Sequence, residues 1–168
     1  MSRYWLLLGA WASAVFASAD DTHTVTVTVS PDLYVSFEER QVPDACHTSP
    51  GSCEVNGTPR IGAISAPPDS YLSRISLRYK DRTYLLDSGH MYNPQLAGRA
   101  VPARPEGWVH ASCMDAENCV VRVVLGDAGD TYVAEWYVLD GKSLRTLLSP
   151  SEDLINLFMK DIRPPVYE

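Results

Sequence analysis

The stretch that decides the fold is residues 119–162, which read CVVRVVLGDAGDTYVAEWYVLDGKSLRTLLSPSEDLINLFMKDI. Two runs rich in β-branched and aromatic residues, 120–125 and 131–139, predict strands, and the turn-forming residues 126–130 separate them. Asp140-Gly141 predicts a tight hairpin next, because a type I′ turn needs positive φ at both central residues. That turn sets the cross-strand pairs Val138–Ser143, Tyr137–Leu144, Trp136–Arg145 and Val133–Leu148.

An amphipathic helix is expected over 150–162. Ser149 is the predicted cap, Pro150 takes the first helical position and Glu152 closes a capping box. The apolar stripe at helical spacing consists of Leu154, Leu157, Phe158 and Ile162, widened by Ile155 and Met159. We therefore expect an α+β or mainly β fold, built from antiparallel meanders and hairpins with one C-terminal amphipathic helix packed on the sheet.

Two further hairpins support this fold class. Residues 22–29 alternate Thr and Val after His23, so the valines face a core, and 33–37 continue the alternation beyond a turn at Ser30-Pro31-Asp32. The pattern loosens from residue 38 to residue 68. A second hairpin turning at 80–81 places four apolar residues on one face, in the pairs Leu77–Tyr84 and Ile75–Leu86.

Residues 1–19 have the pattern of a secretory signal peptide. Arg3 precedes an apolar run, and Ala17-Ser18-Ala19 is a small-x-small cleavage site. The run is too short for a comfortable membrane span, although an uncleaved anchor is the alternative. We expect a leader of bacterial type at 1–19 and a single globular exported domain at 20–168, periplasmic or alternatively extracellular.

The cysteines agree with export. An even number of cysteines in an exported domain indicates disulfides, and spacing alone leaves their pairing open. Local pairs are favoured because each closes a short polar turn, namely Cys46–Cys53 and Cys113–Cys119. Asn56-Gly57-Thr58 matches a glycosylation sequon but also reads as a turn, which the bacterial leader favours.

The charge of the chain limits its partners. Without Arg3 the exported domain has 13 basic and 21 acidic side chains, a formal charge of −8. Nucleic acid and anionic membrane surfaces select Lys and Arg clusters, so neither is an expected partner after leader cleavage. A basic protein partner would be attracted, although a net charge that only maintains solubility is the more common case.

Residues 88–110 form the candidate recognition segment. They contain three prolines and three glycines without any sustained period, and connections of this length usually have a function. The segment also holds residue types typical of interfaces, so the expected contact residues are His90, Met91, Tyr92, Arg99, Arg104 and Trp108. The alternative is that Tyr92 and Trp108 pin the segment onto the core.

Catalytic motifs are lacking in the sequence, which contains no GxSxG elbow, HExxH, phosphate loop, GxGxxG or CxxC pair. Ser88 and His90 are near in sequence, but that spacing does not ensure a nucleophile–base hydrogen bond. Asp127 and Asp130, with Asp115 and Glu117, are a weak cation candidate, because turn loops contain such residues anyway. No cofactor and no metal site is expected.

The leading functional hypothesis is a non-enzymatic periplasmic binding protein of the inhibitor or immunity type. It would occlude the active site of a basic enzyme that targets the cell envelope, inserting residues 88–108, with or without the 46–53 loop, into the enzyme's cleft. A small exported hydrolase using Ser88, His90 or the loop acids is the second hypothesis. A structural or adhesive envelope subunit, which should expose a long unpaired strand edge, is the third.

Overall fold

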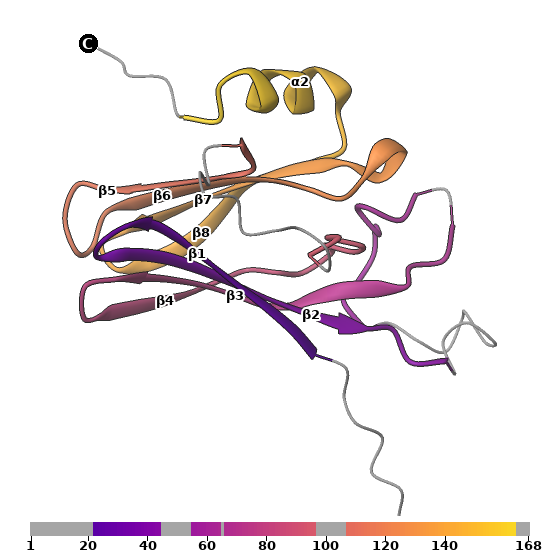
Figure 1. Ribbon diagram of the computed structural model, residues 1–168, viewed down its shortest axis with the longest axis horizontal. Coiled ribbons are helices and arrows are strands. Elements are labelled where there is room, and N and C mark those ends of the chain that lie inside the picture. The colour runs from indigo at the N-terminus through magenta and orange to yellow at the C-terminus, as the bar shows by residue number, and fades with distance from the viewer. Residues whose placement is uncertain (1–21, 45–54, 65, 97–106, 164–168) are drawn as a thin grey trace, which may run out of the picture.

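The computed structural model describes residues 22–44, 55–64, 66–96 and 107–163. Two four-stranded antiparallel sheets face each other, and one helix lies on the outer side of the second sheet (Figure 1). The prediction of antiparallel hairpins with a C-terminal helix packed on a sheet is confirmed. The first sheet contains β1 (Thr22–Ser30), β2 (Leu33–Gln41), β3 (Ser70–Tyr79) and β4 (Arg82–Leu86). The second contains β5 (Val109–Cys113), β6 (Cys119–Leu125), β7 (Tyr132–Leu139) and β8 (Lys142–Ser149), and α2 (Glu152–Lys160) follows it.

Alternating apolar residues build the first sheet as predicted. Val25 and Val27 are buried, and the β3–β4 hairpin has the predicted pairs Leu77–Tyr84 and Ile75–Leu86. The inner faces of the two sheets share one core. Trp136 from β7 is fully buried in it, while the rings of Phe37 and Trp108 lie 5.3 Å apart at an angle of 43°. This shared core makes the two sheets one packing unit.

β2 is longer than the sequence pattern predicts. The apolar alternation becomes irregular from residue 38, but the strand continues to Gln41. Glu39 points inward and is buried. Its Oε1 accepts a 2.6 Å hydrogen bond from Ser70 Oγ, and its Oε2 accepts one of 3.1 Å from the backbone N–H of Leu96. A charged residue at an inward position breaks the apolar alternation, and only these long-range donors make its burial acceptable.

The register of the β7–β8 hairpin is partly as predicted. Val138–Ser143, Tyr137–Leu144 and Trp136–Arg145 are paired, which confirms the turn at Asp140-Gly141. The predicted pair Val133–Leu148 is wrong.

A β-bulge at Thr146 causes that difference. Glu135 pairs with Leu147, one position beyond the predicted partner, so Val133 lies opposite Ser149. Thr146 Oγ1 donates a 2.7 Å hydrogen bond to Glu135 Oε1 on the outer face. The bulge turns Leu147 toward α2 and Leu148 toward the core between the sheets, where strict alternation would do the reverse.

The helix differs from its prediction at both its start and its surface. Its N-cap is Ser151, whose side chain makes no capping hydrogen bond, and Ser149 belongs to β8. Phe158 is buried against Val124 and Val133, which lie on the outer face of the second sheet. Leu157 and Met159, both expected in the apolar stripe, are 57% and 66% exposed. One helix on one sheet buries a narrower stripe than six apolar residues suggest.

The disulfide Cys113–Cys119 is present as predicted and joins neighbouring positions of β5 and β6. The predicted pair Cys46–Cys53 and the predicted leader lie outside the described residues. No helix in the described ranges is long and apolar enough to cross a membrane.

Candidate functional site

Four hairpin turns gather at one end of the sandwich, on the left of Figure 1. In the first sheet the turns at 31–32 and 80–81 are neighbours, because the backbone N–H of Lys80 donates to Asp32 O at 2.8 Å. In the second sheet the hairpin 114–118 and the turn at 140–141 are neighbours, because the N–H of Gly141 donates to Glu117 O at 3.1 Å. The four turns lie at the same end of the two stacked sheets and therefore form one loop surface. We call this surface the hairpin end; it consists of residues 31–32, 80–81, 114–118 and 140–141.

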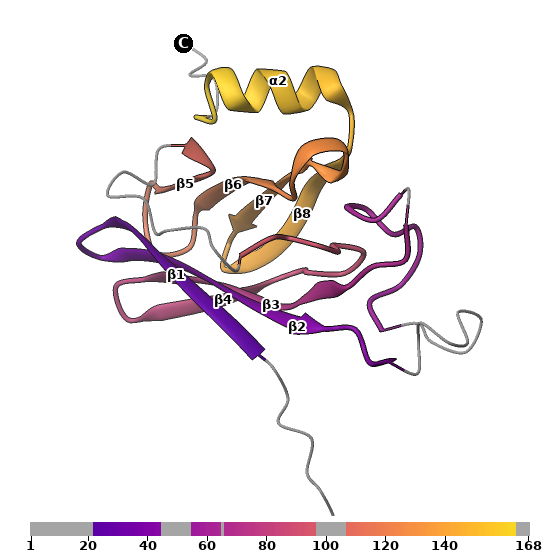
Figure 2. The same ribbon diagram turned by 45° about the vertical axis from the view of Figure 1, so that its right-hand side comes forward.

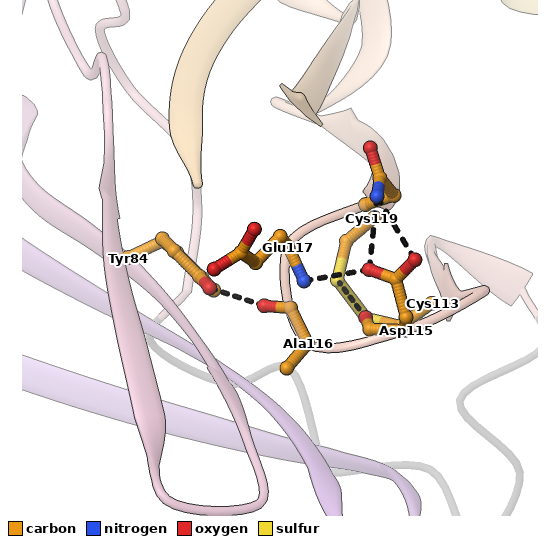
Figure 3. The surroundings of a disulfide bond; sticks show 7 residues. Tyr84, Cys113, Asp115, Ala116, Glu117 and Cys119 are labelled. Atoms are coloured by element: carbon orange, nitrogen blue, oxygen red, sulfur yellow. Dashed lines mark hydrogen bonds between the residues drawn. A yellow bond between two sulfur atoms is a disulfide. The ribbon is translucent and has the colours of Figure 1, made fainter. Parts of the chain in front are cut away.

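The loop 114–118 of the hairpin end is held by a disulfide and by several hydrogen bonds (Figure 3). The Cys113–Cys119 disulfide closes its base, and the N–H of Met114 donates to Asn118 O at 2.9 Å. Asp115 Oδ1 accepts a 2.8 Å hydrogen bond from the N–H of Glu117 and one of 2.9 Å from Asn118 Nδ2. These hydrogen bonds, that of Glu117 first, hold the pKa of the Asp115 carboxyl below its ordinary value.

The same loop is tied to the first sheet. The hydroxyl of Tyr84 on β4 donates a hydrogen bond to Ala116 O across the gap between the sheets, as Figure 3 shows. Arg82 and Glu117 are 3.6 Å apart, and both are about half exposed, so this ion pair adds little stability. The loop position is thus fixed by backbone and hydroxyl contacts more than by charge pairing.

The braced loop presents an apolar tip among carboxylates. Met114 is 92% exposed, although methionine is usually buried. Carboxylates outnumber cations around this tip. The exposed carboxylates of the hairpin end are Asp32, Asp81, Asp115, Glu117 and Asp140, and the exposed cations are Lys80, Arg82 and Lys142. A rigid apolar tip with an acidic surround is suited to recognition of a basic surface that has an apolar pocket.

The residues predicted to contact a partner lie at the opposite end of the sandwich or outside the description. Met91, Tyr92 and Trp108 are buried in the core, and His90 is half-buried. Arg99 and Arg104 lie outside the described residues. Burial of Tyr92 and Trp108 agrees with the alternative that these two side chains hold the segment on the core. Met91 is buried with them, so none of the three side chains is offered at the surface.

Segment 88–96 is bound to the sandwich by other parts of the chain. Asn56 Nδ2 donates to Ser88 O at 3.1 Å and to Met91 O at 3.0 Å. Arg145 donates to Gly89 O at 2.6 Å. Because the Asn56 amide nitrogen makes two internal hydrogen bonds, the Asn56-Gly57 turn has a structural role here.

Ser88 and His90 do not form a catalytic pair in the described structure. The carboxylate of Asp87 binds Arg145 at 3.0 Å and the N–H of Gly89 at 2.8 Å, so it does not orient the imidazole. The imidazole of His90 lies against Gly57, and its buried Nδ1 has no hydrogen-bond partner. A hydrolase needs a nucleophile–base hydrogen bond, and none joins these side chains among the described contacts.

Two of the acids proposed for a weak cation site, Asp115 and Asp127, accept local hydrogen bonds that order their own loops. Asp127 Oδ1 accepts from the N–H of Ala128 at 2.8 Å and caps the short 3₁₀ helix η3 (Ala128–Asp130). Within the described ranges, no group of three or more His, Cys, Asp or Glu side chains is placed to hold a metal ion.

A cleft of about 570 Å³ opens between β1, β5 and the end of α2. His110 lines it beside Arg163, and Arg122 faces His110 across the β5–β6 pair. Burial first, and then the charges of Arg122 and Arg163, lower the pKa of His110, while Asp161 opposes them. Arg122 is held at 2.6 Å by Glu135, and both side chains are mostly buried. The cleft therefore holds an imidazole whose charged form is disfavoured, beside paired charges.

The Cys113–Cys119 disulfide was predicted from the sequence, whereas the hairpin end was not predicted as a site. Part of the hairpin end could have been predicted from the order of the strands. In an antiparallel meander successive turns alternate between the two ends of the sheet, so the turns at 31–32 and 80–81 lie at the same end. The packing of one sheet on the other, which brings the second pair of turns to the same end, has no sequence signal. No family model, curated protein or solved structure matches this chain.

Proposed function

We propose that this protein is a non-enzymatic binding protein of the inhibitor or immunity type, located in the bacterial periplasm. In this proposal it occludes the active site of a basic enzyme that attacks the cell envelope, and the hairpin end is the contact surface. The observation that carries the proposal is the disulfide-closed loop 114–118, which holds Met114 at 92% exposure. A loop that is ordered before binding loses little conformational entropy on association.

Charge and redox chemistry support the same function. The chain has a formal net charge of −7, and carboxylates outnumber cations at the hairpin end. An acidic contact surface accelerates encounter with a basic partner and disfavours acidic competitors. The disulfide Cys113–Cys119 fits an oxidising compartment outside the cytoplasm.

The proposal moves the contact surface away from residues 88–108. Met91 and Tyr92 support the sandwich from inside the core, so the side chains offered to the enzyme come from the turns instead. Met114 would enter the cleft of the enzyme, with Asp115 and Glu117 facing its basic rim. Methionine is enriched at interfaces because its unbranched side chain adapts to irregular apolar pockets.

The test measures inhibition of purified basic envelope hydrolases, chosen to include peptidoglycan glycosidases, peptidoglycan amidases and phospholipases. For each enzyme that the protein inhibits, the inhibition constant is compared for the wild-type protein, Met114→Asp and Met159→Asp. Met159 is the matched control, since it is 66% exposed but lies on α2. We expect Met114→Asp to raise the constant by about 30-fold, the effect of a ~2 kcal/mol hot spot, and Met159→Asp to leave it unchanged.

Two outcomes would contradict the proposal. One is equal inhibition by Met114→Asp and the wild-type protein, which would place the contact elsewhere. The other is that no basic hydrolase is inhibited while the protein itself degrades envelope material, which would favour an enzyme. Raising the ionic strength should slow association with an inhibited enzyme, because salt screens the attraction between the acidic turns and the basic surface.

A further inference from the structure

Three of the four edges of the described sheets have features that discourage pairing with a strand from another molecule. β4 and β5 are only five residues long. β8 contains Lys142 and Arg145 and is bent by the bulge at Thr146. Short strands, charged side chains and bulges are the usual means by which proteins protect the edges of their sheets. These three edges are therefore poor templates for another strand.

β1 has none of these features along most of its length. It is nine residues long, contains no Pro, Lys, Arg, Asp or Glu, and is bulged only near its end, between Thr28 and Ser30. Among the described residues β2 pairs with one side of β1, and no strand pairs with the other side, as the edge position in Figure 2 shows. Every second residue of such an edge directs its backbone N–H and C=O groups away from the sheet.

We propose that β1 is a self-association surface, and that a second copy of the chain pairs with it antiparallel across a two-fold axis at Thr26. Thr26 is the midpoint of the strand Thr22–Ser30, so this register pairs the whole strand. Thr24 then lies opposite Thr28 of the second copy, and Val25 lies opposite Val27 of the second copy. The two first sheets become one eight-stranded sheet, and the backbone groups of both edges are hydrogen-bonded.

The chemistry of β1 favours a second copy over an unrelated acidic or basic peptide. The register keeps the buried valines of both strands on the inner face, so neither core has to rearrange. Threonines face threonines on the outer face, a favourable cross-strand combination. The chain has a formal net charge of −7, and two copies repel each other at acidic surfaces, whereas the β1 strip carries no formal charge at neutral pH. Apart from His23, which lies opposite Val29 of the second copy in this register, the edge is thus self-complementary in polarity and charge.

Sedimentation equilibrium over a concentration series of the full chain, with its disulfide formed, tests the proposal. The edge variant, Thr24→Lys combined with Thr28→Lys, places lysine opposite lysine twice in the proposed register. We expect it to weaken the dimer about tenfold, because like charges directly opposite each other destabilise a strand pair and the register repeats the pair twice. The control variant, Thr83→Lys combined with Leu85→Lys, adds the same charge to exposed positions of β4 and should leave the dimer unchanged.

A third variant tests the register itself. Thr24→Lys with Thr28→Glu places opposite charges across the same two pairs, so it should dimerise at least as well as the wild-type chain. A wild-type chain that stays monomeric up to about 1 mM, the limit of weak specific association, would overturn the proposal. Equal dimerisation of the edge variant and the control variant would also overturn it, because the interface would then lie away from β1.

Discussion

Removing the Cys113–Cys119 disulfide should destabilise the protein by about 2 kcal/mol. The two cysteines are six positions apart, so the bond closes a short loop in the unfolded chain. The loop-closure entropy of such a loop corresponds to about 2 kcal/mol at 25 °C. The variant that tests this value is Cys113→Ala combined with Cys119→Ala. Because Asp115 still accepts its hydrogen bonds from Glu117 and Asn118, the native loop should keep its shape.

A second contribution comes from packing. Cys119 is buried in the core between the sheets, so alanine leaves a small void that adds up to about 1 kcal/mol to the loss. Urea unfolding followed by tryptophan fluorescence should show a free energy of unfolding lower by about 2–3 kcal/mol. The melting temperature should fall by roughly 4–10 °C in a domain of this size. The variant Cys46→Ala combined with Cys53→Ala, measured with and without a reductant, separates the two contributions, because reduction then breaks only the Cys113–Cys119 bond and leaves the Cys119 side chain in place.

Either of two results would refute this reasoning. A loss below about 0.5 kcal/mol in the double variant would mean that the unfolded chain gains almost no freedom from the broken bond. The same conclusion would follow if the reductant lowered the melting temperature by less than the substitution Met114→Ala does, because Met114 is an exposed position. The hydrogen bonds of Asp115 and Tyr84 would then suffice to order the hairpin end.

Two further predictions concern α2 and the sheet beneath it. The pKa of His110 is lowered in the folded protein, so the unfolded chain binds the proton more tightly. The contribution of His110 to stability should therefore be constant above about pH 6.5 and should fall as the pH drops from there through the folded-state pKa. His110→Gln should remove this part of the pH dependence from a series of unfolding curves. Phe158→Ala should lower the free energy of unfolding by about 3 kcal/mol and expose the α2 amides to hydrogen exchange, since this ring is the buried anchor of the helix. Leu157→Ala, at a mostly exposed position, should change the free energy by less than about 1 kcal/mol, and an equal loss in both variants would contradict the described helix face.

Local sequence signals were sufficient for the strand pairs that lie close to a hairpin turn. Asp140-Gly141 gave the pairs on both sides of its turn, and the apolar residues flanking 80–81 gave the register of β3 and β4. These features depend on backbone conformation and on side-chain alternation, both of which act over a few residues. The pairing of Cys113 with Cys119 belongs to the same class, because the cysteines occupy opposite positions of one hairpin.

Longer-range features could not be predicted in the same way. The bulge at Thr146 allows Leu147 to face the helix and Leu148 to face the core, a requirement that exists only once both layers are present. In the sequence, the charged residue Glu39 indicates the end of a strand. In the structure it is an inward residue of β2, because Ser70 and Leu96 donate hydrogen bonds to its carboxylate. Segment 88–96 reads as an exposed recognition motif, although its Met and Tyr side chains are buried in the core.

The sequence by itself determined the hairpin turns and the C-terminal helix and favoured the Cys113–Cys119 disulfide, because each follows from contacts between residues close along the chain. Only the tertiary structure decided which surfaces are exposed. Stacking one sheet on the other buried Met91, Tyr92 and Leu96 and brought four turns to one end. It also left β1 as the long uncharged edge of the described sheets. Whether a residue is buried depends on which segments, distant in the sequence, pack against it. These contacts involve all the strands, so they cannot be predicted from any single stretch of residues.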